Sequence, residues 1–286
     1  MLRDEIEKLV AAGASADRDA ARDAFARLRA ALSSGEVRSA EPDHACYGGW
    51  RVNTWVKQGI LLGFRVGDIV EMPIRQAAYG ASYWQFFDKD TLPPRRFVAG
   101  EQPSLRIVPG GSSVRDGAFI GRGVICMPPM FVNIGAWIGE QTLIDSHGLV
   151  GSCAQIGARV HVSAGAQIGG VIEPVGALPV IVEDDVMVGG NTGIYEGAII
   201  KAGAVVGAGT VLTGSTPVYD LVRGSIIKPT ADRPLVIPEN AVVVPGARAV
   251  TAGNGPEWGL SLATPIIVKY RDSRTDTRTE LEAWIR

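Results

Sequence analysis

Residues 132–168 read VNIGAWIGEQTLIDSHGLVGSCAQIGARVHVSAGAQI, and an apolar residue stands at every sixth position of this stretch. The same frame extends upstream to Val108 and contains eleven positions. These are Val108, Val114, Ile120, Cys126, Val132, Ile138, Ile144, Val150, Ile156, Val162 and Ile168. All eleven are apolar, which chance would give in roughly one sequence in a thousand at this composition. Ten of them are Val or Ile, which makes the pattern rarer still.

A second run with the same period follows after the segment GGVIEPVGALPV. It comprises Val182, Val188, Ile194, Ile200, Val206 and Leu212. Its phase is shifted by two positions, so the intervening segment contains an insertion. Gly often follows the apolar position directly, and small or β-branched residues recur four positions after it. We expect these glycines to take the strained turn conformations and the β-branched residues to point inward.

A period of six fits neither the 3.6-residue period of a helix nor the two-residue alternation of a strand. It fits a short strand, a tight turn and another short strand, with three hexads closing one triangular coil. The pattern is typical of a parallel β-helix with hexapeptide repeats, and a sandwich with Gly-rich turns is disfavoured by the constant phase. β-Helices of this class are usually left-handed and trimeric, so we expect a mainly β, left-handed parallel β-helix and a homotrimer.

The flanks lack the six-residue period. RDEIEKLVAA, ADRDAARDAFARLRAAL and NTWVKQGILLGFR predict helices in the N-terminal flank, the second ending near Gly35 and the third capped by Asn53. SLATPIIVKYRD predicts a strand and TDTRTELEAWIR a short closing helix. We therefore expect an α-rich domain over 1–105, the β-helix over 106–247 and a C-terminal β/α cap over 248–286.

Composition narrows the classes of function. The chain has 286 residues, a formal net charge of -2 and 46% hydrophobic residues, which gives no support for a nucleic-acid-binding surface. No apolar run approaches the roughly 18 residues of a membrane span, and the N-terminus is too acidic for a secretory signal. Three unpatterned cysteines fit a reducing compartment, so we expect a cytoplasmic protein without membrane or nucleic-acid partners.

Three segments of the repeat region carry a resemblance to a known family. LRIVPGGSSVRDGAFIGRGVICMPPMFVNIGAWIG, GSCAQIGARVHVSAGAQIGGVIEP and VEDDVMVGGNTGIYEGAII closely resemble tetrahydrodipicolinate N-succinyltransferase of the lysine and diaminopimelate pathway. The resemblance implies a trimer with active sites between subunits, succinyl-CoA as co-substrate and no permanently bound cofactor. The acceptor would be the amine of ring-opened tetrahydrodipicolinate, an amino-dicarboxylate.

The resemblance also assigns residues. The family's acceptor-binding Arg and Asp match Arg106 in LRIVP and Asp145 in LIDSH. The functional Glu of the family is replaced by Gly193 and the Arg before it by Asn191, whereas a second Glu survives as Glu196. These departures lie inside the site.

Acyl transfer to an amine needs a base that takes a proton during the attack. Asp145 is a candidate for acceptor binding or base work, and Glu196 is a weaker one. His147, two positions from Asp145, either acts as the base or only fills the space of a family Trp. His161 is more consistent with packing, and Cys153 with packing in a small-residue run.

For CoA we expect a groove along the stacked coils, lined by backbone groups of GAIIKAGAVVGAGT, which includes Gly207. Lys201 and Lys269 are candidates for contacts with the CoA phosphates. Either lysine could equally be only solvated.

Three alternatives remain open at this stage. The first is a divergent acyl-CoA N-acyltransferase that acts on another amino acid in specialised metabolism. The second is a β-helical zinc lyase of the carbonic anhydrase kind, for which only His44, His147 and His161 exist as ligands. The third is an inactive scaffold, and we expect no metal site in the succinyltransferase itself.

Overall fold

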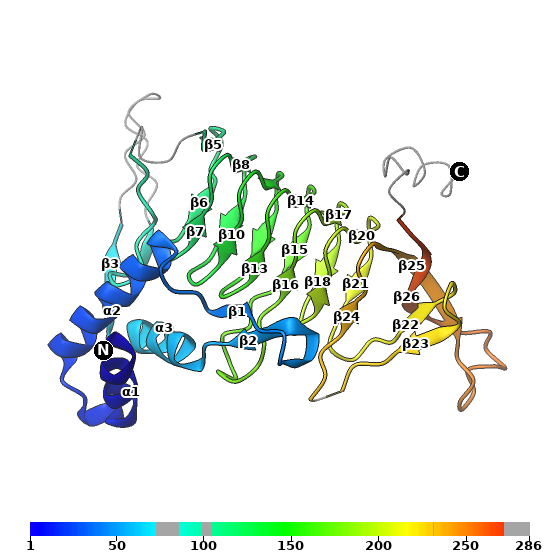
Figure 1. Ribbon diagram of the computed structural model, residues 1–286, viewed down its shortest axis with the longest axis horizontal. Coiled ribbons are helices and arrows are strands. Elements are labelled where there is room, and N and C mark those ends of the chain that lie inside the picture. The colour runs from blue at the N-terminus through cyan, green and yellow to red at the C-terminus, as the bar shows by residue number, and fades with distance from the viewer. Residues whose placement is uncertain (73–85, 99–103, 231, 272–286) are drawn as a thin grey trace.

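A three-sided parallel β-helix forms the centre of the molecule, with helices packed at its N-terminal end and a long hairpin at the other (Figure 1). The computed structural model describes residues 1–72, 86–98, 104–230 and 232–271. Within these ranges no helix is long and apolar enough to cross a bilayer. The three stacks of short parallel strands confirm the predicted parallel β-helix of hexapeptide repeats.

Each side of the prism is a stack of short parallel strands. The first sheet contains β7 (Phe119–Ile120), β10 (Trp137–Ile138), β13 (Gln155–Ile156), β16 (Ile181–Val182), β19 (Ile199–Ile200) and β24 (Val236–Ile237). The second begins with β5 (Arg106–Ile107), β8 (Ile125–Cys126), β11 (Leu143–Ile144), β14 (His161–Val162), β17 (Met187–Val188) and β20 (Val205–Val206). The third contains β6 (Ser113–Val114), β9 (Phe131–Val132), β12 (Leu149–Val150), β15 (Gln167–Ile168), β18 (Gly193–Ile194) and β21 (Val211–Leu212).

The strand register sets the length of a regular coil at three hexads. Trp137 pairs with Phe119 on one side and with Gln155 on the other. Gln155 then pairs with Ile181, whereas a regular coil would bring it to Glu173. The insertion therefore amounts to one hexad plus the shift of two positions seen in the sequence. A longer insertion separates Ile199 from its partner Val236.

The predicted Val/Ile column forms the core of the prism, except at its first position. From Val114 to Leu212 its members are at most 5% exposed, and the small or β-branched residues four positions later are also buried. At the N-terminal end Ile107, not Val108, pairs with Cys126, because the first strand lies one position earlier than the frame predicts. No described coil covers this end from above, so Ile107 remains 36% exposed.

The glycines that directly follow the residues of the column do not adopt the strained turn conformations that we expected of them. Left-handed backbone occurs instead at the third position after the buried residue, for example at Gly117 and Gly209, and also at His147 and Asn191. The glycines directly after the column have no positive φ and allow adjacent coils to stack closely. A Cβ on Gly139 would lie 2.4 Å from the carbonyl carbon of Gly157 in the next coil. These positions are small because of the neighbouring backbone.

The N-terminal helices are α1 (Leu2–Ala11), α2 (Arg18–Ser34) and α3 (Thr54–Val66), with a short 3-10 turn at Gly13–Ser15. All three predicted helices are confirmed. The Asp17 side chain accepts the amide of Ala20 at the start of α2, and Gly35 ends it in the left-handed conformation. Asn53 precedes α3, but its amide group donates to the carbonyl of Arg38 instead of capping the helix.

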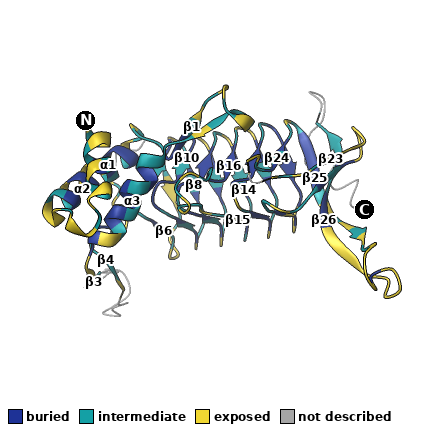
Figure 2. Ribbon diagram, turned by 90° about the horizontal axis from the view of Figure 1, so that it is seen from below, coloured by how far each residue is buried: buried dark blue, intermediate teal, exposed yellow. Residues whose placement is uncertain are grey.

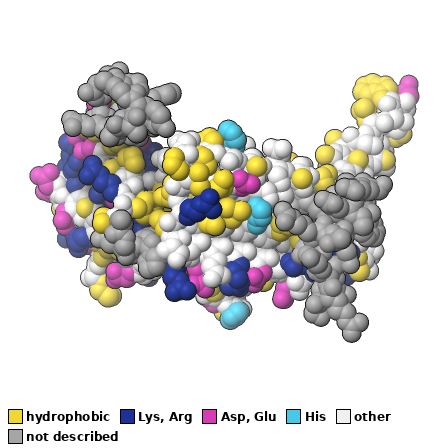
Figure 3. Space-filling model, turned by 90° about the horizontal axis from the view of Figure 1, so that it is seen from above, with side chains coloured by type: hydrophobic (Ala, Val, Ile, Leu, Met, Phe, Trp, Pro, Cys, Tyr) yellow, Lys and Arg dark blue, Asp and Glu magenta, His cyan; other side chains and the backbone are white. Residues whose placement is uncertain are grey.

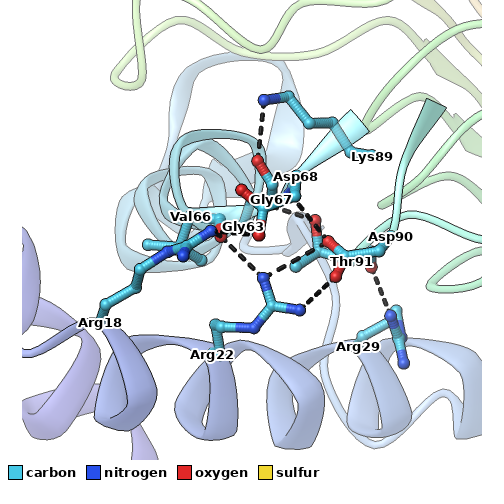
Figure 4. A network of polar contacts seen from close by, with 10 residues as sticks. All are labelled: Arg18, Arg22, Arg29, Gly63, Val66, Gly67, Asp68, Lys89, Asp90 and Thr91. Atoms are coloured by element: carbon cyan, nitrogen blue, oxygen red, sulfur yellow. Dashed lines mark hydrogen bonds and ion pairs between the residues drawn. The ribbon is translucent and has the colours of Figure 1, made fainter. Parts of the chain in front are cut away.

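Arginines of α2 join this helix to the end of α3 and to the segment around Asp90 (Figure 4). Arg22 pairs with Asp90 and donates to the carbonyl of Val66, and Arg29 pairs with Asp116 at the start of the prism. The strands β3 (Ile69–Glu71) and β4 (Phe87–Lys89) form a small ribbon beside this network. The chain after α2, with β1 (Ala40–Pro42), a 3-10 turn at Tyr47–Gly49 and β2 (Trp50–Val52), then runs along the first sheet.

The C-terminal strands prolong the second sheet. β25 (Ala241–Ala249) pairs with β20 and with β26 (Ser261–Tyr270), and β22 (Val218–Asp220) and β23 (Ser225–Ile227) complete the sheet. The tip of the β25–β26 hairpin projects from the prism and is exposed (Figure 2). β25 crosses the predicted 247/248 domain boundary, and the closing helix predicted for TDTRTELEAWIR lies outside the described residues.

Candidate active site

One edge of the prism carries the predicted acid–base residues. This Asp145 edge lies between the second and third sheets and consists of the turns 127–130, 145–148, 163–166, 189–192 and 207–210. Backbone hydrogen bonds stack the turns into a column. The amide of His147 donates to Pro129 O at 2.5 Å, that of Gly165 to Ser146 O at 2.8 Å, and that of Gly209 to Gly190 O at 2.9 Å.

Asp145 and His147 lie together in one turn of this edge. Asp145 follows the buried Ile144, and its carboxylate accepts the amide of Ser146 at 2.7 Å. It is half-buried and takes part in no ion pair with a described residue. His147 is exposed and adopts a φ of +61°, so the turn presents its imidazole to solvent. The pair offers a carboxylate and an imidazole to a molecule lying on the edge.

Arg106 lies on the face next to this edge. It pairs with Ile125, which in turn pairs with Leu143, so two strand spacings of about 4.8 Å separate Arg106 from Leu143. Asp145 follows Leu143 by two positions, and Arg106 is exposed. A guanidinium and a carboxylate therefore stand on adjoining parts of one surface.

The outer surface of the second sheet, next to Arg106, carries mostly apolar side chains. Figure 3 shows hydrophobic side chains gathered over the β-helix and interrupted by a few basic and histidine side chains. The outer residues of the second sheet include Ile125, Leu143, His161 and Met187, all half-buried. His161 thus faces outward on β14 and is not part of the Asp145 edge.

Glu196 does not join Asp145 within this chain. It lies on a different edge, in the turn between β18 and β19, and its carboxylate accepts the amide of Gly214 at 2.7 Å. The repeat predicts this separation of Glu196 from Asp145. Positions on one edge recur every three hexads, and the insertion adds one hexad and two further residues. Asp145 therefore stacks with Ser163, Gly189 and Gly207, and residue 196 falls elsewhere.

Tyr195 occupies the space beside Gly193, a relationship that the sequence analysis missed. A Cβ on Gly193 would lie 2.4 Å from ring atom Cε2 of Tyr195, and one on Gly169 would lie 2.8 Å from Cδ1. The Tyr195 hydroxyl donates to Oε1 of Gln167 at 2.7 Å. The ring is thus seated on two glycines, and its hydroxyl is held on the outer surface of the third sheet. The only sequence signal was a Tyr two positions after the unexpected Gly193.

Asn191 stands at the left-handed turn position of the Asp145 edge, with a φ of +54°. Asn tolerates this conformation better than most residues with a side chain. Its Oδ1 lies above Gly165, where a Cβ would come within 2.4 Å.

The three residues predicted to contact CoA lie in separate places. Gly207 lies on the Asp145 edge, and its amide donates to Val243 O at 2.7 Å. Lys201 lies on another edge, where its ammonium group contacts Glu183 Oε1 and Gly48 O, each at 2.7 Å. Lys269 lies on β26, paired with Val242 of β25. The structure therefore does not bring the two lysines to one phosphate site.

The buried cysteines and the histidines do not form a reactive cluster. Burial raises the pKa of the Cys153 thiol, which contacts Ser39 and packs among apolar residues, and burial raises the pKa of Cys126 to about 12. His147 and His161 lie on the edge and the outer face described above, whereas His44 lines a cavity beside the first sheet. Among the described residues no three His, Cys, Asp or Glu side chains are grouped to hold a metal ion.

Comparisons with known proteins agree with this architecture. The family pattern described as tetrahydrodipicolinate N-succinyltransferase N-terminal matches residues 1–66, and that of the hexapeptide repeat of succinyl-transferase matches residues 179–214. A solved structure from Campylobacter jejuni, described as a candidate 2,3,4,5-tetrahydropyridine-2-carboxylate N-succinyltransferase, superposes with a TM-score of 0.56 at 17% identity. The match covers 86% of this chain and 62% of that one, and it shows the shared fold.

Curated relatives match almost the whole chain. A 2,3,4,5-tetrahydropyridine-2,6-dicarboxylate N-succinyltransferase of Rhodopseudomonas palustris is 40% identical over 269 residues, covering 93% of this chain and 90% of the relative. The enzyme of the same name from Nitrobacter winogradskyi is 41% identical over 276 residues, covering 95% and 92%. On this likeness, the chain belongs to the tetrahydrodipicolinate N-succinyltransferase family.

Proposed function

We propose that this protein transfers the succinyl group of succinyl-CoA to the amino group of ring-opened tetrahydrodipicolinate, in lysine and diaminopimelate biosynthesis. The observation that carries the proposal is the likeness to N-succinyltransferases over more than nine-tenths of the chain, together with Arg106 and Asp145 on one surface. The alternative acceptor in specialised metabolism receives no support from the relatives.

The reaction is a direct attack on the thioester. The lone pair of the amine forms a bond to the succinyl carbonyl carbon, and the carbon–sulfur bond breaks. The amine loses one proton, and the CoA thiolate gains one. Asp145 or His147 receives the proton from the amine, because both groups are accessible in the same turn. Arg106 holds a carboxylate of the acceptor through charge-assisted hydrogen bonds.

We place CoA along the Asp145 edge, beyond His147 and toward the β25–β26 hairpin. The exposed side chains of the turns there are small, with Asn191 the longest of them, so no long side chain blocks a narrow molecule. The backbone amides of Ala164, Gly190 and Ala208 donate to no acceptor within the described part of the chain, and they repeat at the spacing of the coils. These amides suit the carbonyl groups of a pantetheine arm. Gly207 belongs to this path, Lys269 stays a candidate for a phosphate contact, and Lys201 is left out because of its bonds to Glu183 and Gly48.

We further propose a homotrimer whose adjoining copies complete the site. The apolar outer face of the second sheet is suited to cover by a second copy, since exposed apolar patches of this kind mark interaction surfaces. The Tyr195–Gln167 pair lies on the third sheet, on the far side of the Asp145 edge, and would meet the acceptor only across such an interface. The free cysteines fit a cytoplasmic enzyme, with a CoA thioester as co-substrate and no permanently bound cofactor.

Purified protein would test the activity with succinyl-CoA and tetrahydrodipicolinate. We expect acceptor-dependent release of the CoA thiol and a product whose mass increases by one succinyl group. Reactions with acetyl-CoA and without acceptor are the controls. Thiol release that does not depend on the acceptor, or a clear preference for another acyl chain, would contradict the proposal.

A further inference from the structure

A cavity of about 660 Å³ lies between the segment after α2 and the first sheet, away from the Asp145 edge. Arg38 and Trp50 line it from the segment, and Phe119 and Trp137 line it from β7 and β10. The Phe119 and Trp137 rings stack with centroids 3.9 Å apart, so the two aromatic side chains together form one part of the cavity wall. Its size and largely apolar lining are those of small-molecule sites.

Arg38 is the unusual group in this cavity. Its guanidinium carbon lies 4.0 Å from the centroid of Trp137 and 5.5 Å from that of Trp50. Among the described residues it has no ion-pair partner, and burial lowers its pKa to about 10. Aromatic stacking compensates part of the cost of desolvating a guanidinium, and an oppositely charged partner would compensate more.

The orientation of Arg38 is fixed before any ligand arrives. Its Nε donates to Oε1 of Gln155 at 3.0 Å, and Gln155 is itself buried and bonded through Nε2 to Cys153 O. Neither Nη atom of Arg38 donates to an acceptor in the described ranges. Two parallel N–H donors are thus held rigidly and unused, which is the arrangement that binds a carboxylate through two hydrogen bonds.

The remaining charges indicate how many negative charges a ligand can carry. The Lys201 ammonium is already paired with Glu183, which also accepts Trp50 Nε1 at 2.9 Å. Glu140 and Asp184 line the same cavity together with Arg122, and Asp184 is paired with Arg159 at 3.5 Å. Apart from Arg38, the positive and negative side chains there therefore balance, and a polyanion such as a diphosphate would find only one unpaired positive charge. A ligand with a single negative charge and an apolar body fits this balance.

We propose that this cavity binds a small organic monocarboxylate, whose carboxylate pairs with the Arg38 guanidinium and whose apolar body lies against Trp50 and Trp137. The site is separate from the Asp145 edge and does not depend on the proposed succinyl transfer. Its ligand class is therefore tested by binding, without an activity assay.

Calorimetric titration of the full-length protein with benzoate gives the first test. We expect benzoate to bind, and benzamide, which has the same shape without the charge, to bind at least tenfold more weakly. Inorganic pyrophosphate should not displace benzoate. Equal affinity for benzoate and benzamide, displacement by pyrophosphate, or no binding of benzoate would overturn the proposal.

Variants locate the site. Arg38→Met should weaken benzoate binding at least tenfold and Arg38→Lys about fivefold, since Lys keeps the charge but loses the paired donors. Arg223→Met is the matched control, because Arg223 also stacks on an aromatic ring, 4.2 Å from the Tyr270 centroid, outside the cavity. If Arg38→Met does not fold, Arg38→Lys and a crystal soaked with 4-iodobenzoate decide. An iodine position outside the cavity, or unchanged affinity in the Arg38 variants, would refute the assignment.

Discussion

The ring of Tyr195 lies across Gly193, so close that a Cβ on residue 193 would come within 2.4 Å of ring atom Cε2. The two positions are therefore coupled. The absence of a side chain at 193 is what admits the ring, and the ring carries its hydroxyl to Gln167. In this chain the absence of a side chain at Gly193 and the placement of the Tyr195 ring therefore depend on each other.

Restoring a Glu at position 193 tests this coupling. Gly193→Glu alone should displace the ring and destabilise the protein by about 2 kcal/mol, as overpacking does. The double variant Gly193→Glu with Tyr195→Val should recover most of that loss. Urea unfolding of the wild type, of Gly193→Glu, of Tyr195→Val and of the double variant measures the coupling. Additive effects would show that the two positions are independent. Tyr195→Phe, which keeps the ring, should leave stability nearly unchanged and lower kcat/KM for the acceptor.

Asp145→Asn should reduce kcat about 100- to 1000-fold if the carboxylate holds or deprotonates the attacking amine. The variant removes charge without changing volume, so the melting temperature should stay close to that of the wild type. Glu239→Gln, at an exposed carboxylate on another edge, is the control and should keep full activity. Initial rates at saturating succinyl-CoA measure the difference. An Asp145→Asn enzyme with normal kcat would remove Asp145 from the mechanism.

Arg106→Met should raise KM for the acceptor at least tenfold and leave KM for succinyl-CoA nearly unchanged. The reason is that its guanidinium is proposed to hold a carboxylate of the acceptor and not the thioester. Arg106→Lys should lie between the two, because it keeps the charge but not the paired donors. Equal increases in both KM values would argue for a general structural role.

Asp90→Asn should cost about 1 kcal/mol of unfolding free energy at pH 7. The hydrogen bond from Arg22 lowers the pKa of Asp90 in the folded protein. Its contribution is therefore complete above the ordinary carboxyl pKa of about 3.9 and disappears as the pH falls through the lower folded value. The difference between wild type and variant should shrink below about pH 4. Asp23→Asn, in an exposed pair with Arg27, is the control and should change stability little.

Two glycine substitutions distinguish coil stacking from turn strain. Gly139→Ala would place a Cβ 2.4 Å from the backbone of Gly157, and we expect a loss of about 3 kcal/mol. A Cβ on Gly209 would meet no atom within 4 Å, so Gly209→Ala should lower the free energy of unfolding only because of its φ of +73°, by about 1 kcal/mol. Chemical denaturation gives both values. The reverse order would contradict the assignment of these positions.

The interior of the prism was predictable because every sixth position must carry an apolar side chain that fills the core. Ile144 and Val150 are buried for the same reason in successive hexads, and their column needs no knowledge of the rest of the fold. The edges were predictable in principle, since counting in steps of three hexads separates Glu196 from Asp145. Glu196, assigned by likeness, and Lys201, chosen from its place in the Gly/Ala-rich stretch, both lie away from the Asp145 edge of this chain.

Other features depend on packing that no pattern in the sequence expresses. The seat of Tyr195 on Gly169 and Gly193 joins two coils through one side chain. The position of the half-buried Arg38 between Trp50 and Trp137 depends on how the segment after α2 crosses the first sheet. In both cases the position of an aromatic ring depends on contacts between distant parts of the chain. The six-residue period of the sequence predicts only the path of the backbone that carries the ring.

The segment after α2 is fastened to coils that are made much later. Trp50 bonds to Glu183, 133 residues further along the chain, and Gly48 to Lys201, 153 residues further. During synthesis the segment therefore cannot form these two hydrogen bonds until most of the β-helix has been made. A nascent chain stopped before residue 183 would expose Trp50 and the first-sheet surface that it later covers, which makes this stage the natural moment for chaperone capture.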